Sequence, residues 1–346
     1  MKVLFVGLGG IGQRHARNLR ALLQDGVAIH AYRARRLTQT LTDQLEIEPQ
    51  VNLEEKYNVI VHRDLDEALA VGPQAVFICN PSSLHMPVAL KAAAAGCHLF
   101  VEKPLSHNLE HTDELVNLVR DKHLVGLVAY QLRFHPCVVR LRAIVEEGLI
   151  GRVLAARVEV GEYLPGWHRY EDYRQMYASR ADLGGGVILS QIHEFDYLYW
   201  LFGLPRRVFT IGGHFSSLDI DVEDVASSVM EFNYQGRPVA VQIHQDYVQR
   251  PPSRGTMVLG DSGKVVVDFR GLSLTRYDDT GAVAEHQDYS GLQRNQLFLD
   301  EMAHFLACLR GEAAPIVSIA DGAQSLRMAL AARQSIDTGK VVELTP

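Results

Sequence analysis

Three glycines close to the start of the chain have the spacing of a phosphate-binding turn. In the stretch VGLGGIGQRH, Gly7, Gly9 and Gly12 follow an apolar run and open a helical pattern. There the first glycine permits a tight turn, the second lets a pyrophosphate approach, and the third lets helix and strand pack closely. Backbone N–H groups at the helix start, those of Gly10 and Ile11 among them, would bind the phosphates. The alternative is a glycine-rich turn that binds nothing.

The cofactor expected at this turn is NADP, with NAD as the alternative. A fold that binds NAD normally places an acid at the end of its second strand, where the acid binds the ribose 2′-hydroxyl. Here no carboxylate occurs between Ala28 and Leu41, and that stretch carries Arg33, Arg35 and Arg36 instead. Arginine suits a 2′-phosphate. A solvated basic turn in an NAD-binding protein remains the other interpretation.

Two further motifs follow apolar runs, FICNPSSLH (Phe77–His85) and LFVEKPLSHN (Leu99–Asn108). Open α/β sheets bind ligands at the carboxyl ends of parallel strands, so both motifs are expected beside the cofactor. Lys103 stands between a strand and a proline, where it can hydrogen-bond a substrate oxygen and assist proton transfer. A solvated charge is the alternative. The residues expected to contact the cofactor here are Asn80, Pro81, His85, Glu102 and Lys103 itself.

A histidine followed by two acids is the candidate acid–base group. The stretch GGGVILSQIHEFDYL (Gly184–Leu198) has three glycines that let a loop turn into a helix, which presents His193. Asp196 lies three residues further on and can share a helix face with His193, so it could support a protonated imidazole. Glu194 points elsewhere on the helix and is expected to be structural or a rim contact. A histidine packed in the core is the alternative, and a metal site lacks a second histidine at ligand spacing.

The segment before Gly184 is dense in aromatic and charged residues and is expected to cover the substrate. Rings there can stack on a sugar while polar groups bind its hydroxyls, and Arg174 or Arg180 could hold a carboxylate or phosphate. Aromatic residues at a subunit interface are the alternative. Arg133 is expected to line the same cleft. The substrate-binding residues predicted from the sequence are Arg133, Tyr163, Trp167, Tyr173, Arg174, Ser190 and Asp196.

The elements that position these residues change in character along the chain. Up to about residue 130, continuous apolar runs alternate with helical patterns, which is typical of a doubly wound parallel sheet. Later runs such as Val225–Tyr234 and Pro238–Val248 alternate with a period near two, and Gly255–Phe269 reads as a hairpin. The predicted fold class is therefore α/β, with a Rossmann sheet followed by an α+β domain that has an open, mostly antiparallel sheet.

The composition excludes several classes of protein. The chain has 346 residues, of which 47% are hydrophobic, and a net charge of −7, which argues against a general binder of nucleic acid or anionic membranes. Its four cysteines are scattered without a C-x-x-C pair, so we expect reduced thiols, no metal and a cytoplasmic protein. No apolar run approaches the length of a membrane span.

Together the GLGGIGQRH start, NPSSLH, EKP and the later H-E-x-D resemble the glucose–fructose oxidoreductase / inositol dehydrogenase (Gfo/Idh/MocA) family over essentially the whole chain. The resemblance implies a Rossmann domain, taken as residues 1–128, and a substrate-binding domain, taken as residues 129–346. It also implies a homodimer or homotetramer formed through the second sheet. The implied reaction is reversible hydride transfer between a nicotinamide and a hydroxyl or keto carbon of a sugar, polyol or nucleotide sugar. Lys103 and His193 match the family's catalytic lysine and histidine.

The sequence departs from the family pattern just before the histidine. The family commonly has an aspartate four residues before it and a glycine two before it, and here Leu189 and Gln191 stand at those positions. Either Ser190 takes over the polar role, or catalysis rests on Lys103 and His193 alone. Two other functions stay open. The resemblance also allows an NAD-dependent glycoside hydrolase, as in some relatives, and the departure at Leu189 allows a non-catalytic nucleotide-binding sensor.

Overall fold

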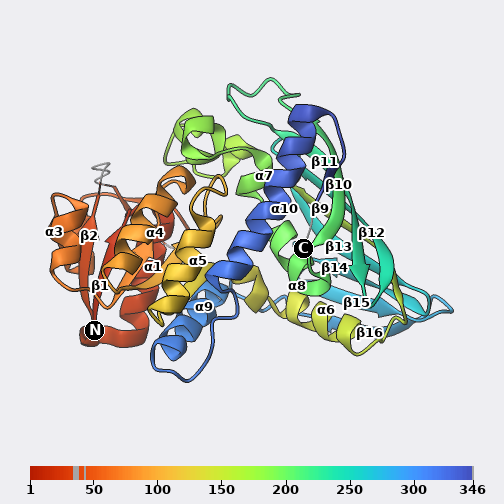
Figure 1. Cartoon of the computed structure of the whole chain (residues 1–346), viewed down its shortest axis with the longest axis horizontal. Helices are drawn as coiled ribbons and strands as arrows, with labels where there is room; N and C mark the ends of the chain where they lie inside the picture. Colours follow the sequence, from red (N-terminus) through yellow and green to blue (C-terminus); the bar gives the residue numbers. More distant parts are fainter. Residues whose placement is uncertain (34–38, 43, 345–346) are drawn as a thin grey trace.

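A computed structural model describes residues 1–33, 39–42 and 44–344, and it contains two large sheets that lie side by side (Figure 1). The first is a parallel sheet with the strand order β5-β2-β1-β6-β7-β8. This is the predicted doubly wound arrangement, and the expected strands are present within one or two residues at each end. Their bounds are β1 Lys2–Val6, β2 Ala28–Tyr32, β5 Val59–His62, β6 Ala75–Ile78, β7 His98–Glu102 and β8 Gly126–Ala129.

Helices connect these strands, as the alternating pattern predicts. The longest of them, α1 (Gly10–Leu23), begins inside the glycine turn, and Phe5 of β1 stacks on Phe77 of β6 within the sheet's core. Two short strands, β3 (Thr40–Leu41) and β4 (Ile47–Glu48), were not expected and form a separate two-stranded ladder. The other helices of this part are α2 Leu53–Tyr57, α3 Leu65–Ala70, α4 His85–Ala94 and α5 Thr112–Asp121.

The second sheet has the order β16-β15-β14-β13-β9-β12-β11-β10-β17. Among the strands that the structure describes in this sheet, only β12 and β9 pair in parallel, so the expectation of a mostly antiparallel sheet is confirmed. In β12, Val239, Val241 and Ile243 are buried while Ala240 and Gln242 are exposed, which leaves one face of the sheet open. Its strands are β9 Val153–Gly161, β10 Pro205–Gly213, β11 Val225–Tyr234, β12 Arg237–Asp246, β13 Ser253–Gly260, β14 Gly263–Asp268, β15 Ser273–Tyr277, β16 Val283–Asp288 and β17 Val342–Glu343.

The covered face of this sheet packs against helices that run between the two sheets (Figure 1). These are α6 (Pro136–Glu146), the short α7 (Val187–Ser190), α8 (His193–Phe202) and α10 (Ile319–Thr338). A single helix was expected after the three glycines, but the chain breaks between α7 and α8. The break makes His193 the first residue of α8.

The later part of the chain also returns to the first sheet. Helix α9 (Arg294–Leu309) packs beside α1 (Figure 1). Its Phe305 contacts the rings of Phe77 and Phe100 in the core of the parallel sheet. The division of the chain between residues 128 and 129 stays a prediction. Within the described residues, no helix is long and apolar enough to cross a membrane.

Candidate functional site

A cavity of about 530 Å³ collects residues from both parts of the fold. Its wall contains the glycine turn, the two strand-end motifs and the start of α8. Of the residues predicted from the sequence, it brings together Gly9, Gly10, Ile11, Asn80, Pro81, His85, Glu102, Lys103, Trp167, Ser190 and His193. A second cavity of about 660 Å³, between the β10–β11 connection and α10, contains none of them. The chemistry therefore belongs to the first cavity.

The glycine turn has the shape that its spacing predicts. Gly7 has φ +96°, and a Cβ there would lie 2.8 Å from the carbonyl carbon of Cys79. A Cβ on Gly12 would lie 2.3 Å from the Gly7 carbonyl oxygen, so only glycine lets the helix start so close to the strand. A Cβ on Gly9 would meet nothing within 4 Å, although Gly9 lines the cavity. This open space over the helix start fits a cofactor pyrophosphate.

Lys103 is held at the carboxyl end of β7 by a contact from the other part of the fold. Its Nζ donates a hydrogen bond to the backbone carbonyl of Ser190 at 2.8 Å. The preceding Glu102 binds Nε2 of His15 at 2.6 Å, which ties the strand end to α1. The ring nitrogens of His85 lie 2.8 Å from the carbonyl oxygens of Asn80 and Pro104, and so join the two strand-end motifs.

His193 is buried at the start of α8, with the Tyr130 ring packed edge-on at 5.6 Å between centroids. Burial lowers the pKa of His193 well below the ordinary value of 6.5, and the positive charges of Lys103, Arg254 and Arg294 lower it further. The imidazole is therefore neutral at neutral pH and can accept a proton. Lys103 and His193 line one cavity, as acid–base partners on a substrate oxygen must.

Comparison with known proteins identifies the family to which this fold and these site residues belong. Residues 1–130 match the model of an oxidoreductase family with an NAD-binding Rossmann fold, GFO/IDH/MocA, and residues 138–266 match the model of the same family's C-terminal domain. The chain belongs to the GFO/IDH/MocA family. It is an oxidoreductase of that family, as the sequence motifs predict.

Relatives within the family match over nearly their full length. A myo-inositol 2-dehydrogenase of Thermotoga maritima is 25% identical, with 99% of this chain and 98% of the relative covered. A solved levoglucosan dehydrogenase in complex with NADH and L-sorbose has a TM-score of 0.82 at 18% identity and covers 100% of this chain and 99% of its own. The WlbA dehydrogenase of Bordetella pertussis, solved with NADH and UDP-GlcNAcA, has a TM-score of 0.80 at 20% identity, covering 100% and 99%. These solved structures share the fold.

The departure from the family pattern has a clear structural consequence. Leu189 stands where the family commonly has an aspartate, and its side chain is fully buried in the hydrophobic core. The polar contact to Lys103 comes instead from the backbone of Ser190, one residue later. Gln191 fills the family's glycine position, lines the cavity, and donates to the Asp246 carbonyl at 3.1 Å. Ser190 thus contacts Lys103 through its carbonyl oxygen and not through its hydroxyl.

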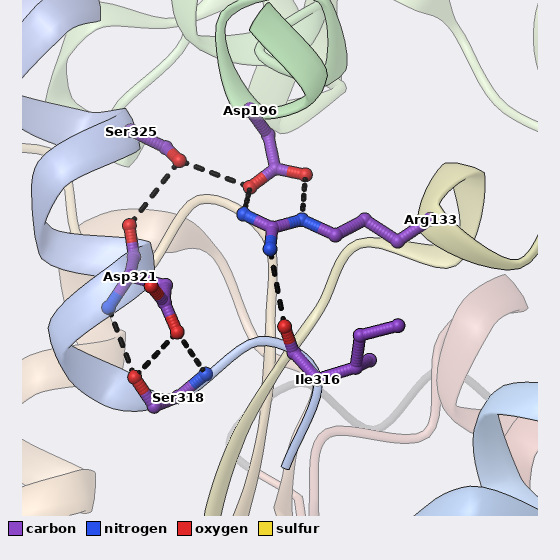
Figure 2. Close-up of polar contacts among 6 residues, drawn as sticks. All are labelled: Arg133, Asp196, Ile316, Ser318, Asp321 and Ser325. Carbon is purple, nitrogen blue, oxygen red and sulfur yellow. Dashed lines mark hydrogen bonds and ion pairs between the residues drawn. The ribbon is translucent and has the colours of Figure 1, made fainter. Parts of the chain in front are cut away.

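The expected support of His193 by Asp196 is wrong, and so is the placement of Arg133 in the cleft. Figure 2 shows why: the Asp196 carboxylate accepts hydrogen bonds from Arg133 Nε at 2.9 Å and Nη2 at 2.8 Å. Ser325 of α10 donates to the same carboxylate at 3.0 Å. Both members of the ion pair are buried and neither lines the cavity. The pair fastens α8 to the turn after β8 and to α10.

Three of the predicted aromatic and charged substrate contacts also lie outside the cavity wall. The Tyr163 ring is covered by the Arg250 guanidinium at 3.9 Å, and the Tyr173 hydroxyl accepts a hydrogen bond from the Asp219 amide. Arg174 is paired with Asp172 and is exposed. Trp167 alone of the four predicted residues in this segment reaches the cavity, together with His168 and Tyr170, which stack on each other.

The basic turn after β2 lies partly outside the described residues. Arg33 binds Glu54 of α2 at 3.2 Å and does not line the cavity, and its contact with a 2′-phosphate stays a prediction. Arg35 and Arg36 lie outside the described residues. Gly7 and Gly12 likewise do not line the cavity, because they shape the turn from behind.

Sequence reasoning missed several charged residues of the cavity wall. Arg254 comes from β13 and Arg294 from the first turn of α9, and Glu162 follows β9. They are far apart in the sequence and belong to no motif, so only the fold could bring them together. Glu194, expected to be structural, is fully buried and binds Arg254 at 2.7 Å. Within the described residues, no group of three or more histidine, cysteine or acidic side chains could hold a metal ion.

Proposed function

We propose that this oxidoreductase transfers a hydride between NAD(P) and a hydroxyl- or keto-bearing carbon of a sugar or polyol. The observation that carries the proposal is the meeting of Lys103 and a neutral, buried His193 in the cavity that also contains the glycine turn. Inositol, levoglucosan and nucleotide-sugar dehydrogenases among the relatives support this class of substrate.

In the oxidation direction, His193 takes the proton of the substrate hydroxyl as the carbon–hydrogen bond breaks. Lys103 donates a hydrogen bond to the same oxygen and stabilises the negative charge that develops there. The Ser190 carbonyl holds the lysine in position. The nicotinamide, when bound, supplies the hydride acceptor. In reduction the same two residues return the proton.

The test is NAD(P)-linked turnover over a panel of sugars, polyols and nucleotide sugars with H193A and K103A. Loss of general acid–base catalysis costs roughly 10²–10⁴ in kcat, and cofactor binding followed by fluorescence should be kept in H193A. The control H111A removes an exposed histidine on the first domain's surface. Unchanged rates in both variants would disprove the catalytic assignment. Turnover without net NAD(P) reduction would indicate the hydrolytic alternative, and ligand binding without turnover a sensor.

For the cofactor we propose a preference for NADP, on the absence of an acid after β2 and the run Arg33, Arg35 and Arg36. The family model and the solved relatives support NAD binding, and the pairing of Arg33 with Glu54 competes with a 2′-phosphate. The ratio of kcat/KM for NADP⁺ to that for NAD⁺ decides the question. A ratio below one would overturn the preference.

We further propose that the protein is a homodimer or homotetramer assembled through the open face of the second sheet, in the cytoplasm. Ile211, Phe209 and Val229 are exposed there, and Phe209 pairs with Val229 across β10 and β11. Charged substitutions I211K and V229K should reduce the mass measured by light scattering, whereas V283K on the edge strand β16 should not. A wild-type monomer would contradict the proposal.

A further inference from the structure

Two arginines line the same cavity as His193. Arg254 comes from β13 of the second sheet, and Arg294 is the first residue of α9. Neither is near the glycine turn in the sequence or is part of a family motif quoted above. Phe298, one helical turn after Arg294, lines the same wall, so this face of α9 looks into the cavity.

Arg254 is held rigidly from behind. Its Nε and Nη2 donate to Oε1 of Glu194 at 2.8 and 2.7 Å, and Glu194 is fully buried beneath it. A guanidinium has five N–H donors, and this carboxylate occupies one edge of the fork. Arg254 also lines the cavity.

Arg294 is placed differently. Among the described residues no hydrogen bond or ion pair joins it to an acid, and it is exposed to solvent at the cavity wall. The positive charges of Arg254 and Arg270 act unfavourably on its guanidinium, and the negative charge of Glu162 acts favourably. Like charges gathered at a cavity wall cost free energy, and an anion between them removes that cost.

We propose that the substrate carries an anionic group, a carboxylate or a phosphate, and that Arg294 together with Arg254 binds it. This inference rests on the proposed function, whose site it refines. Planar guanidinium groups bind carboxylate and phosphate oxygens through paired, charge-assisted hydrogen bonds. The negative charge of Glu162 repels the same anion and therefore weakens its binding. An anionic sugar would thus dock its charge beside His193 while the reacting carbon meets Lys103.

The experiment compares matched neutral and anionic substrates at a saturating concentration of cofactor. Glucose, the neutral member, is paired with glucuronate and with glucose 6-phosphate. Since hydrogen bonds to charged groups are the stronger class, we expect about tenfold or higher kcat/KM for an anionic member. R294A should lower kcat/KM for the anionic member by about tenfold more than it lowers kcat/KM for the neutral member, both measured on the pH plateau. R294K should restore part of the loss.

Two further variants sharpen the comparison. E162Q removes the repelling acid and should raise kcat/KM for the anionic member, opposite to R294A. R310A removes an exposed arginine bound to Glu312 at the far end of α9 and should change neither substrate. If the variants change kcat/KM for only the carboxylate or only the phosphate substrate, that substrate carries the anionic group that the arginines bind.

The outcomes separate this proposal from its rivals. If R294A raises KM for NAD(P)⁺ and not for the sugar, the arginine binds a cofactor phosphate and the proposal is wrong. Equal kcat/KM for neutral and anionic members, with R294A acting equally on both, also overturns it. If no substrate turns over, the proposed function has failed, and calorimetric binding of glucuronate or glucose 6-phosphate to the NAD(P)-loaded protein still tests Arg294. Binding that R294A leaves unchanged would refute its role.

Discussion

Arg133 and Asp196 form a bidentate ion pair that is buried from solvent, with distances of 2.9 and 2.8 Å between donor and acceptor atoms (Figure 2). Arg133 also donates to the Ile316 carbonyl at 3.1 Å. Asp196 stands one helical turn after His193, and Arg133 stands three residues after Tyr130, which packs on His193. The pair therefore fixes the two elements that hold the histidine.

Breaking this pair should destabilise the protein strongly. R133M or D196L alone leaves an unpaired buried charge, and we expect a loss of about 3–5 kcal/mol of unfolding free energy, read as a lower denaturant midpoint. The double variant R133M/D196L removes both charges and should recover much of that loss. Single variants as stable as the wild type, or a double variant no better than either, would contradict this account.

Substitution by alanine should affect stability at Gly12 and cofactor binding at Gly9. G12A places a Cβ 2.3 Å from the Gly7 oxygen, so we expect about 1–3 kcal/mol of destabilisation, seen as a lower melting temperature. G9A meets only open space and should leave the melting temperature without cofactor unchanged. It should nonetheless weaken NAD(P) binding, measured by fluorescence titration, because the methyl group occupies the space left for the pyrophosphate. Normal cofactor binding by G9A would place the phosphates elsewhere.

The lowered pKa of His193 predicts the pH dependence of alcohol oxidation. The base must be unprotonated, so kcat/KM should stay flat as the pH falls through 6.5 and decline only at lower pH. The Tyr130 ring packs on the imidazole of His193. The charged groups that lower the pKa of His193 are Lys103, Arg254 and Arg294. Removing one cation with R294A should move the acidic limb of the profile for a neutral sugar to higher pH. If R294A left the acidic limb at the same pH, the limb would not report the titration of His193.

Restoring the family's aspartate at Leu189 should harm this chain. Leu189 is fully buried among apolar side chains, so L189D buries a carboxyl group without a partner. We expect about 3 kcal/mol or more of destabilisation in urea unfolding. L189M, which keeps volume and polarity, should cost less than about 1.5 kcal/mol. A stable and more active L189D enzyme would show instead that the Ser190 carbonyl is a poor substitute for the acid.

Local patterns were sufficient for much of the fold and for part of the site. The run Lys2–Val6 followed by Gly7 and Gly12 specifies a strand, a tight turn and a helix, because each residue acts on its immediate neighbours. The alternation in β12 likewise indicated which side chains are buried. Lys103 and His193 were found because their motifs surround them, and both line the cavity.

Tertiary structure alone decided which charges meet. Asp196 shares a helix with His193, yet its carboxylate pairs with Arg133, which is 63 residues away in sequence. Arg254 and Arg294 carry no local signal and reach His193 from β13 and α9. Helix spacing states which side chains can share a face, but burial and charge in the folded chain select the partner, since an unpaired buried charge is too costly to keep. The sequence by itself thus determined the Rossmann turn and the lysine–histidine pair, whereas the packing of α8, α9 and β13 determined the electrostatic surroundings in which that pair works.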